Sequence, residues 1–538
     1  MGNRKMAKAE GWLSDEQLAR RVKGLYDYDQ VEVPKVSPEQ RHSWDEVLLG
    51  YTRDEARVEA QRCMQCQDPP CVTACPAHLD IPGYCQAIVD DDLERGLKII
   101  TDAFPIPGAC ARVCYHPCTD VCLKGVDGIP IEIPRLRRFI TDNFDQRALD
   151  YHLPPASSFS IAVIGSGPTG LSCAYHLRRR GHHVVLYERS AVTGGTLNTI
   201  PEYRLPRALL QQEIDTIKWL GVEIKTEHPI KGDGCLDRLL EQFDAVFIAA
   251  GAVSSRKIRT PGAELAGVYH GYDLLHRLHA GEKLLGKRLA VIGGGDVAMD
   301  SLRTALRSCE EVHLIYRRSP LEMPANREEV WDLTEEALHQ EWHHVAVELT
   351  QERRAERFRE LFSNLELLTM ERMAQVEKEL SRELKVESFA HFDKCLENLV
   401  VHFMVSPVRV LGDEQGRAKE LELVRMELGQ PDESGRRRPV PIEGSEFVIS
   451  VDTVIFAIGQ EIDPNWLGAG HGLELEPGNR LKTDEQFETS RPWVFAGGDA
   501  MRGPSNMIQA LGDGRYAAAA IDQKLRARLV TKAGSDGA

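Results

Sequence analysis

The residues of this chain with the clearest chemical potential are eight cysteines in two groups of four. The first group has the spacing C-x2-C-x4-C-x3-C and ends in Cys-Pro, and the second has the spacing C-x3-C-x3-C-x3-C. The eight residues are Cys63, Cys66, Cys71, Cys75, Cys110, Cys114, Cys118 and Cys122. Thiolates at such spacing hold iron–sulfur clusters, and a Cys-Pro at the end of a run is typical of two-cluster segments. The spacing predicts a metal centre that carries electrons, with zinc bound by four cysteines as the alternative.

A glycine-rich turn after the predicted strand 160–164 forms a first dinucleotide fingerprint, G-S-G-P-T-G. Its glycines let the backbone turn tightly and approach a pyrophosphate at the N-terminus of the following helix. The next predicted strand ends before an acid that can accept hydrogen bonds from a ribose hydroxyl. The candidate cofactor-binding residues are Gly165, Gly167, Gly170 and Glu188.

A second fingerprint, G-G-G-D-V-A, follows the predicted strand 288–292 and contributes Gly293, Gly295 and Ala298. The strand after it ends in Arg317-Arg318 and carries no acid. An acid would repel a phosphate, whereas arginines would pair with it, so this pattern predicts NADP(H) rather than NAD(H).

A third signal lies near the C-terminus, where a predicted strand ends in Gly498-Asp499 ahead of a helix. Such a carboxylate can bind the sugar-alcohol chain of a flavin, and the helix N-terminus can stabilise negative charge on the reduced ring.

Composition and the other cysteines limit the function classes. The chain has 538 residues and a net charge of −16, which argues against nucleic acid and anionic membranes as partners. No apolar run is long enough to span a bilayer and no signal peptide is evident, so we expect a cytoplasmic protein. Four further cysteines, namely Cys173, Cys235, Cys309 and Cys395, have no nearby partner. Disulfide reductases need a redox-active pair, so electrons should leave through the cysteine-rich segment.

These motifs require an α/β protein in which a helical iron–sulfur domain precedes two doubly wound dinucleotide-binding domains. The predicted arrangement is an N-terminal arm (1–50), a helical domain (51–152), an FAD domain in two pieces (153–280 and 460–530), an NADPH domain (281–459) and a flexible tail (531–538). A charged helical insert, 341–399, interrupts the NADPH domain.

Several of these motifs together resemble the small subunit of NADPH-dependent glutamate synthase over residues 55–525, apart from the insert. They are Gly194-Gly195 with P-E-Y-R-L-P at 201–206, Tyr316-Arg317-Arg318 with E-M-P-A at 322–325, and A-G-G-D at 496–499. The cysteine-rich segment is also similar to the N-terminal part of dihydropyrimidine dehydrogenase and to the large subunit of bifurcating ferredoxin–NADP transhydrogenases. The resemblance adds Gly195 and Arg204 to the expected cofactor-binding residues.

The resemblance also implies an order of ligands. Cys63, Cys66, Cys71 and Cys122 would hold one [4Fe–4S] cluster, and Cys75, Cys114 and Cys118 would hold three positions of a second. The family often supplies the remaining ligand from a Glu or Gln, but the matching residue is Arg137, which cannot ligate iron. Cys110 is then the candidate ligand, with Glu132 behind it.

The resulting expectation is hydride transfer between NADPH and FAD, followed by single-electron steps through the clusters, with no catalytic acid–base side chain. A partner catalytic subunit in a hetero-oligomer would take the electrons, with glutamate synthase as the default, and the insert could dock a different partner. The alternatives are a stand-alone NADPH:ferredoxin oxidoreductase, the electron-input subunit of another reductase or dehydrogenase, and a non-catalytic zinc-containing regulatory subunit.

Overall fold

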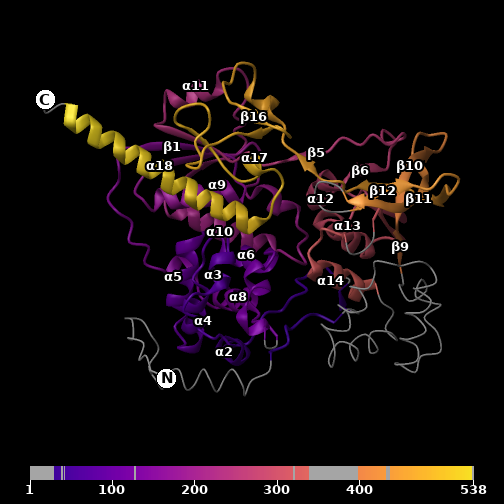
Figure 1. The fold of residues 1–538 in the computed structure, drawn as a ribbon, viewed down its shortest axis with the longest axis horizontal. Helices are drawn as coiled ribbons and strands as arrows, with labels where there is room; N and C mark the ends of the chain where they lie inside the picture. Colours follow the sequence, from indigo (N-terminus) through magenta and orange to yellow (C-terminus); the bar gives the residue numbers. More distant parts are fainter. Residues whose placement is uncertain are drawn as a thin grey trace.

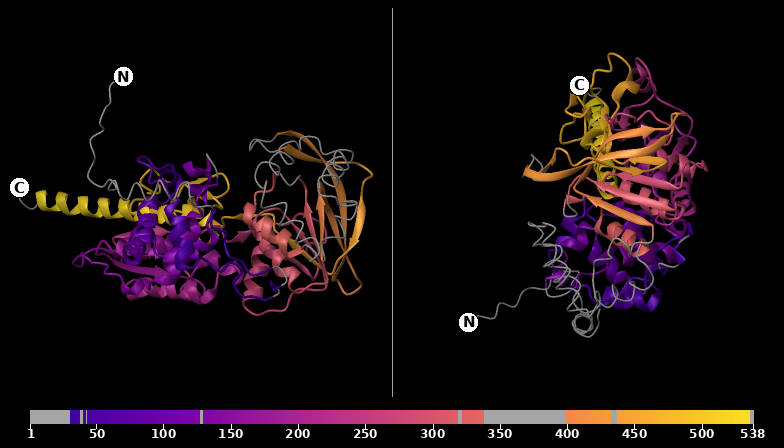
Figure 2. Two further views of the ribbon diagram at one scale, coloured as in Figure 1. Left: turned by 90° about the horizontal axis from the view of Figure 1, so that it is seen from below. Right: turned by 90° about the vertical axis from the view of Figure 1, so that its right-hand side faces the viewer.

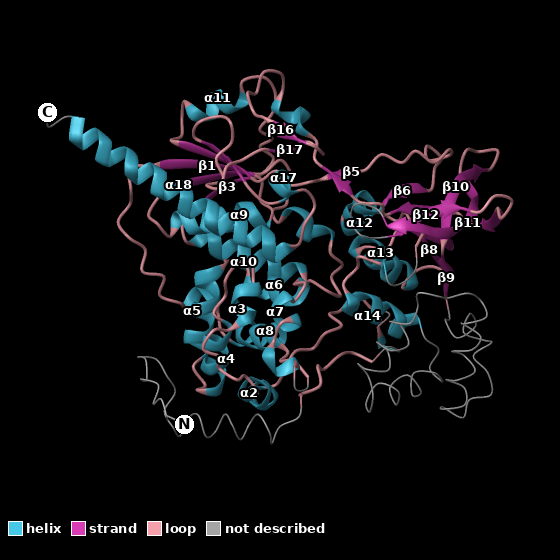
Figure 3. Cartoon of the chain, in the orientation of Figure 1, coloured by secondary structure: helices cyan, strands magenta, loops and turns pink. Residues whose placement is uncertain are grey.

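A computed structural model describes residues 30–37, 40–41, 43–126, 129–318, 322–337, 398–431 and 437–535 (Figure 1). Helices gather in the N-terminal part, and the strands form two separate α/β domains (Figure 3). The predicted α/β class with a helical head and two doubly wound domains is confirmed. Among the described residues, no helix combines the length and apolar character needed to cross a bilayer. The predicted insert falls almost wholly outside these ranges, as do residues 1–29 of the predicted arm.

The head consists of short helices with strong local start signals. Thr52 forms a capping box with Glu55, and the Asp80 side chain accepts a hydrogen bond from Gly83 N. Five of the helices carry proline in their first turn. The helices are α2 (Arg53–Gln61), α3 (Pro70–Ala74), α4 (Ile81–Val89), α5 (Leu93–Ala103), α6 (Pro107–Val113), α7 (Pro117–Asp120) and α8 (Ile133–Asn143). The cysteines therefore lie in these short helices and at their ends, where the chain changes direction.

The first α/β domain has a five-stranded parallel sheet in the order β18-β4-β1-β2-β3. Its strands are β1 (Ser160–Ile164), β2 (His183–Tyr187), β3 (Glu223–Lys225), β4 (Ala245–Ile248) and β18 (Val494–Ala496). Its helices are α9 (Pro168–Arg178), α10 (Arg207–Trp219), α11 (Cys235–Leu240), α17 (Asp499–Arg502) and α18 (Met507–Ser535). Strand β18 comes from far along the chain, so this domain is built from two pieces of the sequence.

The head and the first domain share one hydrophobic core. Phe104 and Leu136 of the head belong to the same buried cluster as Leu171 of α9 and Leu511 of α18. Helix α18 packs along α9, and its C-terminal end projects beyond the domain (Figures 1 and 2). It continues to Ser535 and so includes the first residues of the predicted tail, because the Ala-, Leu-, Arg- and Lys-rich sequence favours helix.

The second α/β domain has a parallel sheet in the order β6-β14-β7-β8-β9. Its strands are β6 (Val268–His270), β7 (Arg288–Ile292), β8 (Glu311–Tyr316), β9 (Leu399–Phe403) and β14 (Thr453–Phe456), and its helices are α12 (Gly271–His279), α13 (Asp296–Leu306) and α14 (Arg327–Ala337). Because β6 pairs with β14, residues 268–279 belong to this domain, ahead of the predicted boundary at 280.

An antiparallel sheet packs beside the second domain and contains β10 (Val405–Gly412), β11 (Ala418–Pro431), β12 (Arg437–Pro441) and β13 (Phe447–Ser450). Two apolar segments of the chain divide here into separate strands. The segment 400–411 breaks at Met404, whose φ is 57°, and the segment 447–458 splits between β13 and β14, which lie in different sheets. The two α/β domains are joined by paired crossing strands, β5 (Ser254–Ser255) and β15 (Gln460–Glu461), and β16 (Leu475–Glu476) pairs with β17 (Arg480–Leu481).

Candidate functional site

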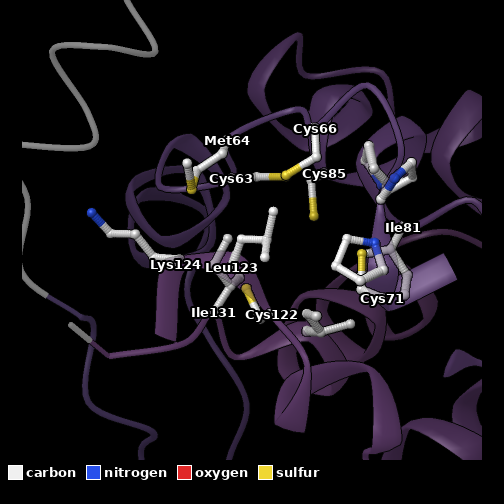
Figure 4. Close-up of a pocket in the computed structure, with 14 residues that line it drawn as sticks. Cys63, Met64, Cys66, Cys71, Ile81, Cys85, Cys122, Leu123, Lys124 and Ile131 are labelled. Carbon is white, nitrogen blue, oxygen red and sulfur yellow. The ribbon is translucent and has the colours of Figure 1, made fainter. Parts of the chain in front are cut away.

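Four cysteines from three places in the head line a single cavity (Figure 4). Cys63 follows α2, Cys66 and Cys71 flank the Pro69-Pro70 start of α3, and Cys122 precedes a short helical turn. The cavity also contains apolar side chains, among them those of Ile81, Pro82, Ile131 and Ile133. These four cysteines are the ligand set that the resemblance implies for one cluster.

The chemistry of these thiols fits an iron–sulfur cluster. Burial, together with the neighbouring Cys63 and Cys122 sulfurs, raises the pKa of Cys71 to about 12, and burial also raises the pKa of Cys66. Thiols in this setting lose their protons only to a strongly positive centre, which cluster iron supplies. Within the described ranges, no three His, Cys, Asp or Glu side chains converge closely enough to hold one metal ion. The four cysteines line one shared cavity, which suits a multi-iron cluster.

Cys85 of α4 also lines this cavity, although no cysteine spacing in the sequence marks it as a ligand. It is fully buried, at 0% exposure, and lies in mid-helix without a nearby cysteine at ligand spacing. Cys85 can therefore serve as a control for the four proposed ligands, because it lines the same cavity but is not one of them.

The remaining cysteines form a second buried set. Cys75, Cys114 and Cys118 interact electrostatically with one another, and the Cys110 thiol donates a hydrogen bond that lowers the pKa of Cys114 to about 6. Cys71 of the first set is also an electrostatic neighbour of Cys118, so the two sets are adjacent. The structure therefore groups Cys110 with the second set, as a candidate fourth ligand.

Glu132, the other candidate, lies in a different environment. Its carboxylate accepts a hydrogen bond of 3.0 Å from Gln30 Nε2, and its electrostatic neighbours are Arg135, Glu328, Glu59 and Lys35. Burial raises the pKa of Glu132, and none of the groups that shift it is a cysteine.

The first glycine fingerprint is tightly packed except at one position. A Cβ on Gly165 would lie 2.4 Å from the Ala249 carbonyl oxygen, and a Cβ on Gly170 would lie 1.9 Å from the Gly165 carbonyl oxygen. A Cβ on Gly167 would meet no protein atom within 4 Å. Gly195 approaches this point, because a Cβ there would lie 2.8 Å from Gly167 Cα. The open space at Gly167 is the place where a pyrophosphate would approach the backbone.

Two carboxylates flank this fingerprint. Glu188 is 7% exposed and accepts hydrogen bonds from Ser166 N and Oγ at 3.0 and 2.6 Å. Asp499, at the start of α17, accepts from Ser505 N and Oγ at 3.0 and 2.7 Å, and burial raises its pKa. A Cβ on Gly498 would lie 2.1 Å from Thr169 Oγ1, so α17 is held against α9.

The second fingerprint repeats the first. A Cβ on Gly293 would lie 2.3 Å from the Ala457 carbonyl oxygen, whereas a Cβ on Gly295 has only Pro324 nearby, at 3.9 Å. Ala298 is fully buried on α13. The two arginines after β8 differ, since Arg317 is exposed and Arg318 is buried and donates a hydrogen bond of 2.9 Å to the Arg437 carbonyl oxygen.

Arg204 connects the two α/β domains. Its guanidinium forms ion pairs of 2.7 Å with Asp300 of α13 and with Glu329 of α14. In this structure the Arg204 guanidinium pairs with carboxylates of the second domain. The expected contact between Arg204 and a cofactor therefore stays a prediction.

The second cysteine set adjoins the helix that follows Asp499. A Cβ on Gly512 of α18 would lie 2.5 Å from the Pro76 carbonyl oxygen, and Arg515 donates a hydrogen bond of 2.5 Å to the Ala77 carbonyl oxygen. The chain segment next to Cys75 therefore packs against α18 of the first domain.

Comparison with known proteins agrees with this arrangement. The family described as dihydropyrimidine dehydrogenase domain II, 4Fe-4S cluster, matches residues 40–149. The family described as pyridine nucleotide-disulphide oxidoreductase matches residues 159–354 and 345–514. The chain is 36% identical over 489 residues to the NADP(+)-dependent formate dehydrogenase subunit beta of Moorella thermoacetica, covering 85% of this chain and 60% of that protein.

Two further comparisons extend the similarity. The chain is 28% identical to the glutamate synthase [NADPH] small chain of Escherichia coli, over 94% of this chain and 99% of that protein. The structure of Mycobacterium tuberculosis FprA in complex with NADPH has a TM-score of 0.52 and 20% identity, covering 71% of this chain and 86% of FprA. This last likeness shows the fold of the two α/β domains.

Proposed function

Because this chain belongs to the pyridine nucleotide-disulphide oxidoreductase family, in the branch with an iron–sulfur head that includes the glutamate synthase small chain, we propose that it is the electron-transfer subunit of a larger enzyme. Its cofactors are FAD, NADP(H) and [4Fe–4S] clusters. Gly165, Gly167, Gly170, Glu188 and Asp499 would hold FAD, and Gly293, Gly295, Ala298, Arg317 and Arg318 would hold NADPH. When bound, the flavin accepts a hydride from NADPH and releases single electrons to the clusters.

One observation carries this proposal: the two cysteine sets lie in series from the first domain to the surface. The segment beside Cys75 packs on α18, Cys118 neighbours Cys71, and Cys66 and Cys122 are partly exposed. Apolar side chains are exposed near the outer set, including Met64 at 40% and Leu123 at 42%. Such a border suits an interface with a partner protein.

We infer that the partner is a separate catalytic subunit. By resemblance, the first candidate partner is the catalytic subunit of glutamate synthase. The second candidate is a dehydrogenase or reductase subunit, because this chain is 36% identical to a formate dehydrogenase subunit and 28% identical to a glutamate synthase small chain. Activity assays of the protein combined with each type of catalytic subunit distinguish the two candidate partners. Glutamate formation from glutamine and 2-oxoglutarate supports the first, and formate-dependent reduction of NADP+ supports the second. Ferredoxin reduction by the chain alone would favour the stand-alone alternative.

An anaerobic NADPH titration tests the relay itself. Flavin absorbance should bleach, and an electron paramagnetic resonance signal from a reduced cluster should grow as the flavin bleaches. Protein that binds flavin and iron but shows no cluster reduction by NADPH would contradict the proposed path.

Paired glycine substitutions should separate the two cofactor sites. Gly167→Val introduces a side chain where the protein leaves space, so the chain should fold but purify without flavin. Gly295→Val should keep the flavin and weaken NADPH binding by at least about tenfold, or about 1.4 kcal/mol. Absorbance spectra and NADPH titrations measure both effects. A Gly167→Val protein with a full complement of flavin, or a Gly295→Val protein with normal NADPH affinity, would contradict the assignment.

A further inference from the structure

The second cysteine set contains a buried cation. Arg137 of α8 is 2% exposed, and its Nη2 donates a hydrogen bond of 2.7 Å to the Cys110 carbonyl oxygen. The guanidinium carbon lies 5.6 Å from the centroid of the Phe104 ring. The strongest favourable charge interactions of Arg137 are with the thiols of Cys110 and Cys114, and Cys118 also contributes. The guanidinium therefore faces the second cysteine set.

Arg137 differs from the two other buried arginines of the same helix. Arg135 forms an ion pair with Glu328, and Arg138 forms one of 2.9 Å with Asp142. Over the described part of the chain, no carboxylate lies within ion-pair distance of Arg137, and its Nε has no hydrogen-bond partner. A guanidinium buried in this way needs a counter-charge, because desolvation without one costs several kcal/mol.

The cysteines of the second set would supply that counter-charge when they ligate a cluster. Four thiolates bound to a [4Fe–4S] cluster carry a net negative charge, which increases by one when the cluster is reduced. The net charge around a cluster is one of the factors that set its reduction potential.

We propose that Arg137 is the charge partner of a [4Fe–4S] cluster held by Cys75, Cys110, Cys114 and Cys118, and that it raises the reduction potential of this cluster. The inference rests on the proposed function, since it assumes the electron relay. A nearby fixed cation stabilises the reduced cluster more than the oxidised cluster, because the reduced cluster carries one more negative charge.

The position of this cluster explains how the positive charge of Arg137 would favour electron transfer. A bound flavin would take a hydride from NADPH and would release the two electrons one at a time and the proton to solvent. The set beside α18 would receive each electron first. A higher potential there makes the transfer from reduced flavin more favourable, and Cys118 next to Cys71 leads onward to the outer set.

Substitution of Arg137 in the full chain tests this role, with redox titration of both clusters by electron paramagnetic resonance and iron analysis as readouts. Arg137→Gln should shift the reduction equilibrium of one cluster about tenfold towards the oxidised form, about 59 mV for one electron, and leave the other cluster unchanged. Arg137→Lys, which keeps the charge, should restore most of the shift. Arg138→Gln is the matched control, because Arg138 is equally buried on α8 but paired with carboxylates, and both potentials should stay unchanged.

Each other outcome decides the question. Unchanged potentials in an Arg137→Gln protein with full iron content would overturn the inference. If Arg137→Gln lacks one cluster, Arg137→Lys decides: a retained cluster of near-normal potential supports the charge role, and its loss overturns it. A wild-type protein that holds one NADPH-reducible cluster would overturn this inference and leave the proposed function standing. A wild-type protein without iron would overturn both.

Discussion

Replacing Cys122 with alanine is expected to remove about four of the eight irons of two [4Fe–4S] clusters and to abolish electron transfer to an external acceptor. Cys122 follows the second set in the sequence but lines the first cavity, so its loss leaves three of the four proposed ligands of that cluster. NADPH should still bleach the flavin, because neither fingerprint touches this residue. Iron analysis, the flavin spectrum and NADPH-dependent reduction of a dye or ferredoxin measure the three effects.

Cys85→Ala provides the matched control for this experiment. Cys85 lines the same cavity and is fully buried, but it lies within α4 and outside the proposed ligand set. The Cys85→Ala protein should therefore keep its full iron content and its electron transfer. Loss of iron in Cys85→Ala together with retention in Cys122→Ala would show that the ligand set is wrong.

The sequence predicted what depends on local pattern. The strands 160–164 and 288–292 have the predicted bounds. Each apolar run ends at a glycine, and the tight turn at that glycine ends the strand. The FAD, NADP(H) and [4Fe–4S] cofactors and the oxidoreductase class are confirmed. They could be predicted because the cysteine spacing and the glycine fingerprints each occupy a short stretch of sequence.

The features that the sequence did not predict depend on contacts between distant segments. Residues 447–458 form one apolar run, yet β13 and β14 pair with different neighbours and so belong to different sheets. Arg204 meets Asp300 and Glu329 only after two domains pack together. Likewise, nothing near Arg137 in the sequence indicates that it lacks a carboxylate partner.

Helix α14 shows how such distant contacts hold the molecule together. Its acidic side chains pair with basic residues of the N-terminal segment and the head, including Lys35 with Asp332 at 2.7 Å and Arg135 with Glu328. Beneath them, Arg303 of α13 is fully buried and forms ion pairs with Glu329 at 2.6 Å and Glu336 at 2.7 Å. The head is thereby fixed to the second α/β domain as well as to the first.

Replacing Arg303 with methionine is expected to lower the opening free energy of α14 by about 3 kcal/mol, because it leaves buried carboxylates without their shared cation. Hydrogen–deuterium exchange of amides 327–337 measures this change. Burial alone would raise the pKa of Asp332, but Arg303 and Lys35 lower it to about 2. A carboxylate with a lowered pKa stabilises the fold above its unfolded value of about 3.9 and loses that contribution as the pH falls towards 2. The difference between wild type and variant should therefore be largest near neutral pH and shrink below about pH 4.

Lys287→Met is the control for this prediction, because Lys287 and Glu310 form an ion pair on the exposed surface of the same domain, with side chains 75% and 66% exposed. Exposed pairs often contribute nothing measurable, so exchange in α14 should not change. Wild-type protection of α14 in Arg303→Met would mean that the surrounding arginines, Arg204 and Arg307, neutralise the carboxylates without help. The buried cation would then add no stability to the junction between the head and the second α/β domain, and the docking of the head would depend on its outer ion pairs.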